Sequence, residues 1–248
     1  MKAMIFAAGL GTRLKPYTLD RPKALVEVNG MPLLEICIRR LLFFGFRDIV
    51  INVHHYADQV VRFLESKNNF QANIQISDES DLLLDTGGGL KRAATLLGNE
   101  APVLLHNTDI LSDLDLAALY RTQQSSEALA TLAVRHRKTS RYLLFDEQQQ
   151  LCGWKNEKTG DTINIRPVKN PEALAFSGIQ VVDPKIFDFF LQGEVFSVVD
   201  LYLKAAETQS IKAFVHDKGH WLDAGKPEKI KEAASLLPSI DLSPYPSI

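Results

Sequence analysis

The chain has 248 residues, 46% hydrophobic and 23% charged, so it can bury a full core as one large domain or two small ones. A formal net charge of −2 and a pI near 6.3 argue against a nucleic-acid-binding surface, which requires an excess of Lys and Arg. No segment approaches the roughly 20 apolar residues of a membrane span, and the N-terminal apolar run is too short for a signal peptide. We therefore expect a cytoplasmic protein with small-molecule partners, whose two cysteines, Cys37 and Cys152, are buried thiols in a reducing compartment.

The first expected element is a strand at residues 2–8, KAMIFAA, which is apolar on both faces as in the interior of a parallel sheet. Gly9 and Gly11 follow it, and without Cβ atoms their backbone N–H groups can approach an anion closely. Arg13 and Lys23 add positive charge to the same loop. The order of strand, glycine turn and cations indicates a loop that wraps around phosphates.

Other glycine-rich loops fit this segment less well. A dinucleotide-binding fingerprint needs a third glycine at the close of the turn, where this chain has Leu14. The P-loop motif is absent, because no Gly-Lys-Ser or Gly-Lys-Thr occurs in the sequence. A purely structural turn remains an alternative, but it would not need Arg13 and Lys23.

Beyond this loop, segments with helical and strand patterns alternate. Helices are expected at residues 32–44, 58–66 and 90–97, and strands at residues 48–53, 72–77 and 103–106. This alternation predicts right-handed crossovers and a parallel sheet with helices on both faces. Ligands of such sheets bind beyond the carboxyl ends of the strands, which are here the loops at residues 9–23, 78–89 and 107–113.

The second of these loops ends in Asp85-Thr86-Gly87-Gly88-Gly89, just before the expected helix. Glycines have no side chains to block a flat ring, so the loop is predicted to receive a nucleobase and ribose on bare backbone. A simple flexible turn is the alternative interpretation.

The third loop carries Asp109 at the carboxyl end of an expected strand, and Asp223 lies far downstream, before a helix that begins near Lys226. Mg²⁺ prefers one or two carboxylates together with phosphates and water, so Asp109 at a strand end is well placed to hold a divalent cation. Each carboxylate alone could equally form a helix N-cap or a turn.

The chain changes character after Leu129. Strands of an antiparallel or mixed extension are expected at residues 130–134, 142–145, 163–165 and 180–182, with polar hairpins at residues 146–150 and 156–161. The six histidines are scattered without the spacing of a metal site. Residues 238–248 form a Pro-rich tail that is either an extended arm or disordered.

The opening loop resembles the signature of the sugar-phosphate nucleotidyltransferases, G-x-G-T-R-(L/M)-x-P-x-T followed by Pro-Lys. Every element of it is present: Gly9, Gly11, Thr12, Arg13, Leu14, Pro16, Thr18, Pro22 and Lys23. The resemblance covers residues 1–237 as one domain. No hexapeptide repeat of the larger members is visible, and the chain is most similar to the short N-acetylmuramate-1-phosphate uridylyltransferase and mannose-1-phosphate guanylyltransferase members.

The resemblance implies the nucleotide-diphospho-sugar transferase fold, a Rossmann-like α/β fold with a mixed, mainly parallel sheet flanked by helices and a small β extension that forms the sugar pocket. It implies an Mg²⁺-dependent enzyme that makes an NDP-sugar and pyrophosphate from an NTP and a sugar 1-phosphate. The residues implied are Arg13 and Lys23 for catalysis; Ala8, Gly9, Leu10, Gly11, Thr12, Arg13, Thr86, Gly87, Gly88 and Asn107 for the nucleotide; Thr108, Ser177 and Gly178 for the sugar; and Asp109 and Asp223 for Mg²⁺.

The sequence departs from the family pattern at three places. Asp85 stands where Glu is commoner, and Thr108 replaces a Gly. The Glu-Lys-Pro that precedes the sugar-pocket strand in many relatives is missing, and the nearest lysines are Lys158 and Lys169. Two other functions stay open, a cytidylyltransferase acting on phosphocholine and a catalytically silent regulatory relative. The nucleobase, the sugar and the oligomeric state are not indicated by the sequence.

Overall fold

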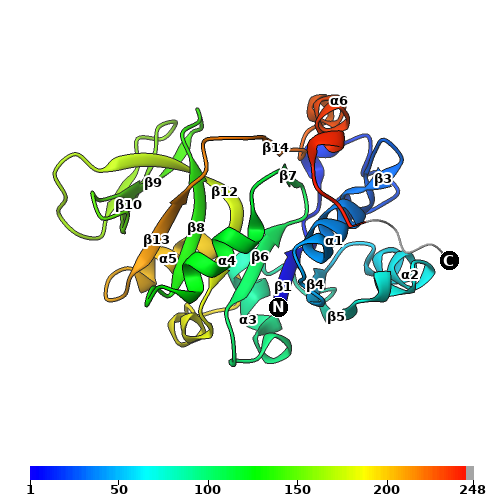
Figure 1. Ribbon diagram of the computed structural model, residues 1–248, viewed down its shortest axis with the longest axis horizontal. Coiled ribbons are helices and arrows are strands. Elements are labelled where there is room, and N and C mark those ends of the chain that lie inside the picture. Colours follow the sequence, from blue (N-terminus) through cyan, green and yellow to red (C-terminus); the bar gives the residue numbers. More distant parts are fainter. Residues whose placement is uncertain (244–248) are drawn as a thin grey trace.

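The computed structural model describes residues 1–243 and is built on a sheet of ten strands (Figure 1). The main path runs in the order β11-β10-β9-β12-β6-β1-β4-β5, and β8 pairs with both β12 and β13. The strands are β1 (Lys2–Phe6), β4 (Asp48–Val53), β5 (Asn73–Asp78), β6 (Val103–Asn107), β8 (Ala130–Arg135), β9 (Arg141–Phe145), β10 (Leu151–Asn156), β11 (Thr162–Asn164), β12 (Glu172–Val182) and β13 (Ile211–Val215).

The half of the sheet built from β1, β4, β5 and β6 is parallel, and the half built around β12 is mainly antiparallel. On the central strand β1, Ala3 and Ile5 belong to one hydrophobic cluster and Met4 and Phe6 to the other. Side chains alternate across a strand, so a continuous apolar run fills the core on both faces. The α/β class, the mainly parallel central sheet and the β extension predicted from the sequence are confirmed.

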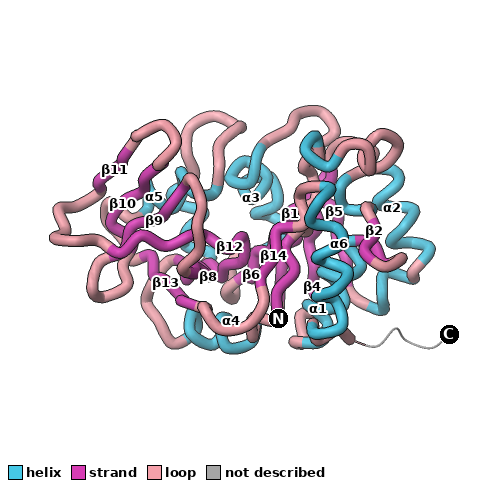
Figure 2. The backbone as a smooth tube through the Cα atoms, turned by 90° about the horizontal axis from the view of Figure 1, so that it is seen from above, coloured by secondary structure: helices cyan, strands magenta, loops and turns pink. Residues whose placement is uncertain are grey.

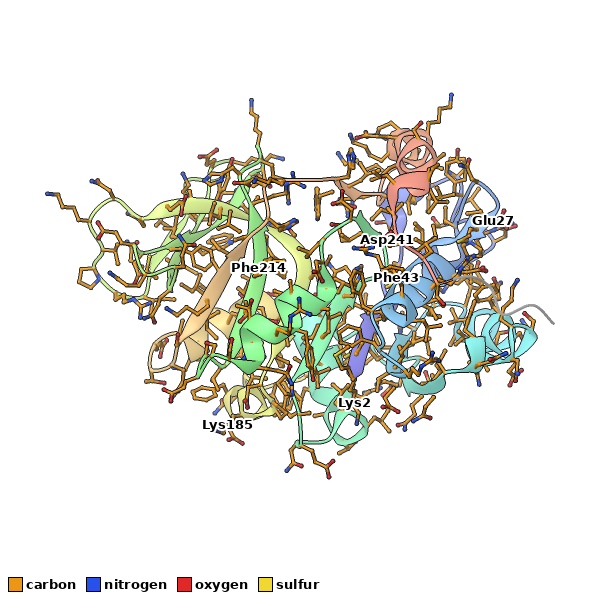
Figure 3. All side chains as sticks on the ribbon, viewed as in Figure 1. Lys2, Glu27, Phe43, Lys185, Phe214 and Asp241 are labelled. Carbon is orange, nitrogen blue, oxygen red and sulfur yellow. The ribbon has the colours of Figure 1, made fainter. Side chains whose placement is uncertain are left out.

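Helices cover both faces of the sheet (Figure 2). The helices α1, α2 and α4 contribute to one cluster and α3 and α5 to the other, while α6 packs in a third cluster near the opening loop. Side chains fill the interior between these layers (Figure 3). The helices are α1 (Leu33–Phe43), α2 (Ala57–Ser66), α3 (Asp85–Leu97), α4 (Leu116–Gln124), α5 (Val198–Ala205) and α6 (Pro227–Leu236).

Two short ribbons complete the fold near the carboxyl ends of the central strands. The strand β14 (Trp221–Asp223) pairs antiparallel with β7 (Ile110–Ser112), and β2 (Glu27–Val28) pairs with β3 (Met31–Pro32). The first ribbon brings a segment near the C-terminus against the loop that follows β6, as the predicted site requires.

The expected tail is an arm over α1 as far as the structure describes it. The backbone amide of Ser243 donates to the carbonyl of Arg39 at 3.0 Å, and Ile240 is buried. Arg40, buried within α1, donates from Nη1 to the carbonyl of Asp241 at 3.3 Å. Residues 238–243 therefore pack on the domain, and the rest of the predicted tail lies outside the described residues. Among residues 1–243, no helix combines the length and apolar character needed to cross a membrane.

Two predicted boundaries are wrong. The strand expected at residues 180–182 is the end of β12, which begins at Glu172. The helix expected at residues 90–97 begins at Asp85, so Gly87, Gly88 and Gly89 lie in its first turns rather than in a preceding loop. The helix can form there because the three glycines are buried against neighbouring segments that fix their backbone. The helices α4 and α5 and the strands β10 and β13 have no counterpart in the elements expected from the sequence.

Candidate active site

The opening loop takes its shape from Gly11, which has a positive φ of 64°. A Cβ atom on this residue would lie 2.9 Å from Cβ of Lys23 and from Cγ2 of Thr18, so only glycine fits. The hydroxyl of Thr18 donates to the Gly11 carbonyl at 2.9 Å and closes the loop. Both Gly9 and Arg13 are exposed, and a Cβ at Gly9 would meet nothing within 4 Å, so the loop is open where an anion would approach.

Lys23 reaches across the site to Asp109, with which it forms an ion pair. The side chains are 15% and 9% exposed, so both charges are held largely away from water. Asp109 lies between β6 and β7, at the carboxyl end of the central sheet. The structure therefore brings together two residues that the sequence analysis placed in one site.

Asp223 joins this pair through the β14–β7 ribbon. It stands opposite Ile110 in the register, and the amide of Ala224 donates to the Asp109 carbonyl at 2.9 Å. A Cβ atom on Gly225 would lie 2.7 Å from Oδ1 of Asp223, 2.9 Å from Oδ2 of Asp109 and 3.1 Å from Nη2 of Arg13. Two carboxylates and a guanidinium therefore converge on the space that Gly225 leaves free.

The two carboxylates of this cluster differ in the direction of their pKa shifts. Burial would raise the pKa of Asp109, but the Lys23 ammonium outweighs it and lowers that pKa. Burial and the neighbouring Asp109 carboxylate raise the pKa of Asp223. Mg²⁺ fits a pair of carboxylates that leaves its other positions to phosphates and water. No group of three or more His, Cys, Asp or Glu side chains suited to a metal exists within residues 1–243.

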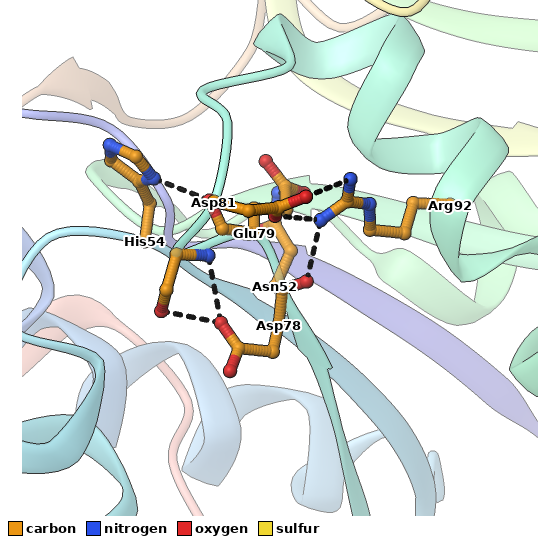
Figure 4. Close-up of polar contacts among 7 residues, drawn as sticks. Asn52, His54, Asp78, Glu79, Asp81 and Arg92 are labelled. Atoms are coloured by element: carbon orange, nitrogen blue, oxygen red, sulfur yellow. Dashed lines mark hydrogen bonds and ion pairs between the residues drawn. The ribbon is translucent and has the colours of Figure 1, made fainter.

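A cavity of about 340 Å³ opens beside the glycine loop, lined by Ala8, Gly9, Asn52, Glu79 and Thr86 among others. Asn52 accepts from the Ala7 amide and donates to Oε1 of Glu79, both at 2.7 Å, so the amide orientation is fixed (Figure 4). Burial raises the pKa of Glu79. The sequence analysis missed both residues, although Asn52 is a polar residue within an otherwise apolar strand.

Two of the three glycines of α3, Gly87 and Gly88, pack against a neighbouring segment, whereas Gly89 faces Asn52 and Glu79. The amides of Gly87 and Gly88 donate to the Phe196 carbonyl at 2.9 and 3.1 Å. A Cβ on Gly87 would lie 2.4 Å from the Phe196 ring, and one on Gly88 would lie 1.9 Å from the Glu194 carbonyl oxygen. These glycines therefore admit residues 194–197, whereas bare backbone for a base was expected. Thr86, half-buried, lines the cavity as expected.

A second cavity, of about 640 Å³, lies between the β extension and α5. It connects the nucleotide side to the expected sugar side, since Thr86 and Asn107 share it with aromatic and charged residues of the extension. Its lining includes Asp85, Thr86, Asn107, Arg137, Thr139, Arg141, Tyr142, Trp154, Asn156, Ile163, Phe176, Ser197 and Asp200.

The expected sugar contacts of Thr108, Ser177 and Gly178 are not supported by their positions. Ser177 is buried, and its hydroxyl lies 2.7 Å from Nε2 of His216. Thr108 is buried as well. Gly178 has φ of +73°, and a Cβ there would lie 2.9 Å from Nδ2 of Asn107, so this glycine makes room for Asn107 rather than for a hexose.

Neither candidate lysine reaches the large cavity. Lys158 is exposed in the turn between β10 and β11, and exposed Lys169 lines a separate surface hollow formed by residues 164–169. The cations in the cavity are Arg137 and Arg141, which the sequence analysis did not identify. Arg137 lies between β8 and β9, and Arg141 is the first residue of β9. The sequence around them does not distinguish these two arginines from surface residues.

The fold and the cluster of Arg13, Lys23, Asp109 and Asp223 define a nucleotide-handling α/β protein with its site at the carboxyl ends of parallel strands. The family model "Nucleotidyl transferase" matches residues 2–239, and the chain belongs to this family.

Curated relatives agree with this assignment. The chain is 32% identical over 237 residues to an N-acetylmuramate alpha-1-phosphate uridylyltransferase of Neisseria meningitidis, covering 95% of this chain and 98% of the relative. It is 48% identical over 109 residues to the enzyme of the same name from Caulobacter vibrioides, covering 43% and 45%. A mannose-1-phosphate guanyltransferase of Yarrowia lipolytica is 27% identical, over 95% of this chain and 64% of the relative.

A crystal structure of a putative glucose-1-phosphate thymidylyltransferase from Bacillus anthracis shares the fold. Its TM-score is 0.81 at 21% identity, and the match covers 99% of this chain and 98% of that one.

Proposed function

We propose that this protein transfers a uridylyl group from UTP to N-acetylmuramate 1-phosphate and releases pyrophosphate. The observation that carries the proposal is the convergence of Arg13, Lys23, Asp109 and Asp223 around Gly225. The two N-acetylmuramate alpha-1-phosphate uridylyltransferases support the choice of substrates, and the first of them aligns over nearly its full length. GTP with mannose 1-phosphate is the second candidate pair, supported by the guanyltransferases.

Each charged group has a distinct task in this proposal. Arg13, exposed on the glycine loop, holds the β- and γ-phosphates that leave as pyrophosphate. Lys23 lies deeper and contacts the α-phosphate and the attacking sugar phosphate. When bound to Asp109 and Asp223, Mg²⁺ would supply positive charge to the reacting phosphates. Phosphoryl chemistry of this kind depends on alignment and charge stabilisation.

No general base is required, because the attacking group is a phosphate monoester that is already anionic at neutral pH. One oxygen of the sugar phosphate bonds to the α-phosphorus while the bond to the β-phosphate oxygen breaks. The glycine loop from Ala8 to Thr12, including Leu10, together with Thr86 and Asn107, is proposed to bind the nucleotide. The cavity beside this loop is proposed to receive the base.

A phosphocholine acceptor is disfavoured because the curated relatives are named for sugar 1-phosphates. The large cavity carries charges of both signs, Arg137 and Arg141 with Asp85 and Asp200. A silent regulatory relative is disfavoured because it would need no complete set of phosphate and metal ligands.

The test is pyrophosphate release from a panel of NTPs and sugar 1-phosphates in the presence of Mg²⁺. We expect the highest kcat/KM with UTP and N-acetylmuramate 1-phosphate. Highest activity with GTP and mannose 1-phosphate would select the second candidate, and no release with any pair would refute nucleotidyl transfer to a sugar phosphate. A cytoplasmic location is part of the same proposal, and fractionation of cells that produce the protein tests it.

A further inference from the structure

Arg137 occupies an unusual position on the wall of the large cavity. It lies between β8 and β9, and its guanidinium carbon is 4.2 Å from the centre of the Trp221 ring. Its Nη2 donates to the Phe176 carbonyl at 2.9 Å. The contact with the Trp221 ring on β14 and the hydrogen bond to Phe176 on β12 hold the guanidinium in one orientation.

The support beneath Arg137 is itself rigid. The indole N–H of Trp221 donates to the Ser177 carbonyl at 2.9 Å, and the Ser177 hydroxyl contacts His216 at 2.7 Å. Both Ser177 and His216 are buried. The guanidinium therefore stands on a fixed platform, as expected of a group that positions a ligand.

The Arg137 guanidinium is not neutralised by an ion pair within residues 1–243. Within the described part of the chain, no carboxylate lies within ion-pair distance of it, and its buried Nε–H has no hydrogen-bond acceptor. Burial lowers its pKa and the charge of Asp223 raises it, which places the guanidinium within electrostatic range of the proposed metal carboxylates. A half-buried, uncompensated cation in a cavity favours an anionic ligand.

We infer that Arg137 binds the phosphate of the sugar 1-phosphate and holds it for attack on the nucleotide. This inference rests on the proposed function. Trp221 is two residues from Asp223 on β14, and Phe176 lines the cavity, so Arg137 lies where the reacting centre meets the acceptor cavity. Arginine suits this task because its fork matches two oxygens of a phosphate. In this inference Arg137 has the role of the missing Glu-Lys-Pro lysine, for which the sequence offered only Lys158 and Lys169.

A carboxylate on the sugar is a second anion that Arg137 could bind. The phosphate is favoured because Arg137 packs on Trp221, two residues before Asp223 on β14, and the phosphate is the part of the acceptor that must approach the proposed metal carboxylates. The exposed Arg141, at the start of β9, lacks both a platform and this proximity.

The test compares R137A and R137K with the matched controls K158A and K169A, which each remove one exposed cation. Pyrophosphate release is measured with varied acceptor and with varied NTP, and melting temperature is recorded. We expect R137A to raise the KM for the acceptor about 10- to 100-fold, as for loss of a charged hydrogen bond, with a small change in the KM for NTP. R137K should recover part of the loss, and both controls should behave as wild type.

Three results would overturn the inference. The first is an unchanged acceptor KM in R137A. The second is an equal rise of both KM values with a lowered melting temperature, which would indicate a structural clamp. The third is a loss confined to acceptors that carry a carboxylate, tested against a neutral sugar 1-phosphate that the wild type accepts. Failure of the proposed function is distinguishable, because the wild-type protein would then release no pyrophosphate with any sugar 1-phosphate.

Discussion

The ammonium group of Lys23 forms an ion pair with the carboxylate of Asp109, although 86 positions separate them in the sequence. The pair joins the glycine loop to the end of the sheet that is proposed to bind the metal. Each partner offsets the cost of burying the other, because an isolated buried charge is costly. In the proposed function, the phosphates of a nucleotide would compete for Lys23, and a metal ion would replace Lys23 beside Asp109. Substrate and metal binding are therefore expected to be coupled.

The positions of Lys23 and Arg13 predict different kinetic effects. Lys23→Ala should lower kcat more than it raises the KM for NTP, because charge shared by attacking and attacked phosphates is greatest in the transition state. Arg13→Ala should weaken NTP binding and slow the reverse reaction with pyrophosphate. Steady-state kinetics in both directions test this, with Lys15→Ala, an exposed lysine of the same loop, as the matched control. A raised KM with unchanged kcat in Lys23→Ala would show that the roles are wrongly divided.

Asp223→Asn should separate activity from stability. Loss of one of two metal carboxylates is expected to lower turnover by about 10²- to 10⁴-fold. Burial and the charge of the buried Asp109 raise the pKa of the half-buried Asp223. Removing the Asp223 charge removes its repulsion with Asp109, so the melting temperature should not fall. The measurements are kcat over a range of Mg²⁺ and thermal unfolding, with the exposed Asp161→Asn as control. Near-normal turnover at limiting Mg²⁺ would contradict the assignment.

Gly225→Ala tests the convergence of the site directly. The added methyl group would lie 2.7 Å from Asp223, 2.9 Å from Asp109 and 3.1 Å from Arg13, so these groups must move apart. We expect turnover to fall at least tenfold, which corresponds to about 1.4 kcal/mol of lost transition-state stabilisation.

Gly160→Ala is the control for that substitution. Its Cβ would meet nothing within 4 Å, but φ of +83° makes the change unfavourable by about 1–2 kcal/mol. It should reduce stability and leave activity unchanged. Full activity in Gly225→Ala would show that the three groups do not act together.

The central sheet could be predicted because its signals are local. The continuous apolar run at β1 and the helical pattern of α1 each specify their own element within a residue or two. The antiparallel extension was harder. The strand β10 includes polar residues and Gly153, and a Cβ on that glycine would lie 2.4 Å from the Ile163 carbonyl oxygen of the next strand. Its pairing is set by contacts that the sequence does not display.

The site residues also divide into those with a local sequence signal and those whose role depends on distant contacts. Gly9, Arg13 and Lys23 could be grouped because they stand in one motif, and Asp109 and Asp223 because the family resemblance pairs them. The glycines of α3 were misread, since a buried contact with Phe196 and an open surface for a base both require a missing side chain. Arg137 and Glu79 could not be identified, because their environment comes from strands far apart in the sequence.

The buried pair of His216 and Ser177 predicts a pH dependence of stability. Burial lowers the pKa of His216 to about 4, below the value near 6.5 of an unfolded histidine. Between these values the unfolded chain binds a proton that the folded protein does not, so stability falls as pH drops from 6.5 toward 4. His216→Gln cannot titrate but can still hydrogen-bond to Ser177.

Between pH 7 and pH 5, the wild type should therefore lose up to about 2 kcal/mol more unfolding free energy than His216→Gln. Urea unfolding of both proteins at the two pH values measures this difference. The exposed His136 has a raised pKa, mainly because of its hydrogen bond to Asp217. Its protonation should therefore increase the unfolding free energy as the pH falls, and His136→Gln serves as the comparison. Identical pH dependence in the wild type and His216→Gln would mean that His216 is not held neutral in the folded protein.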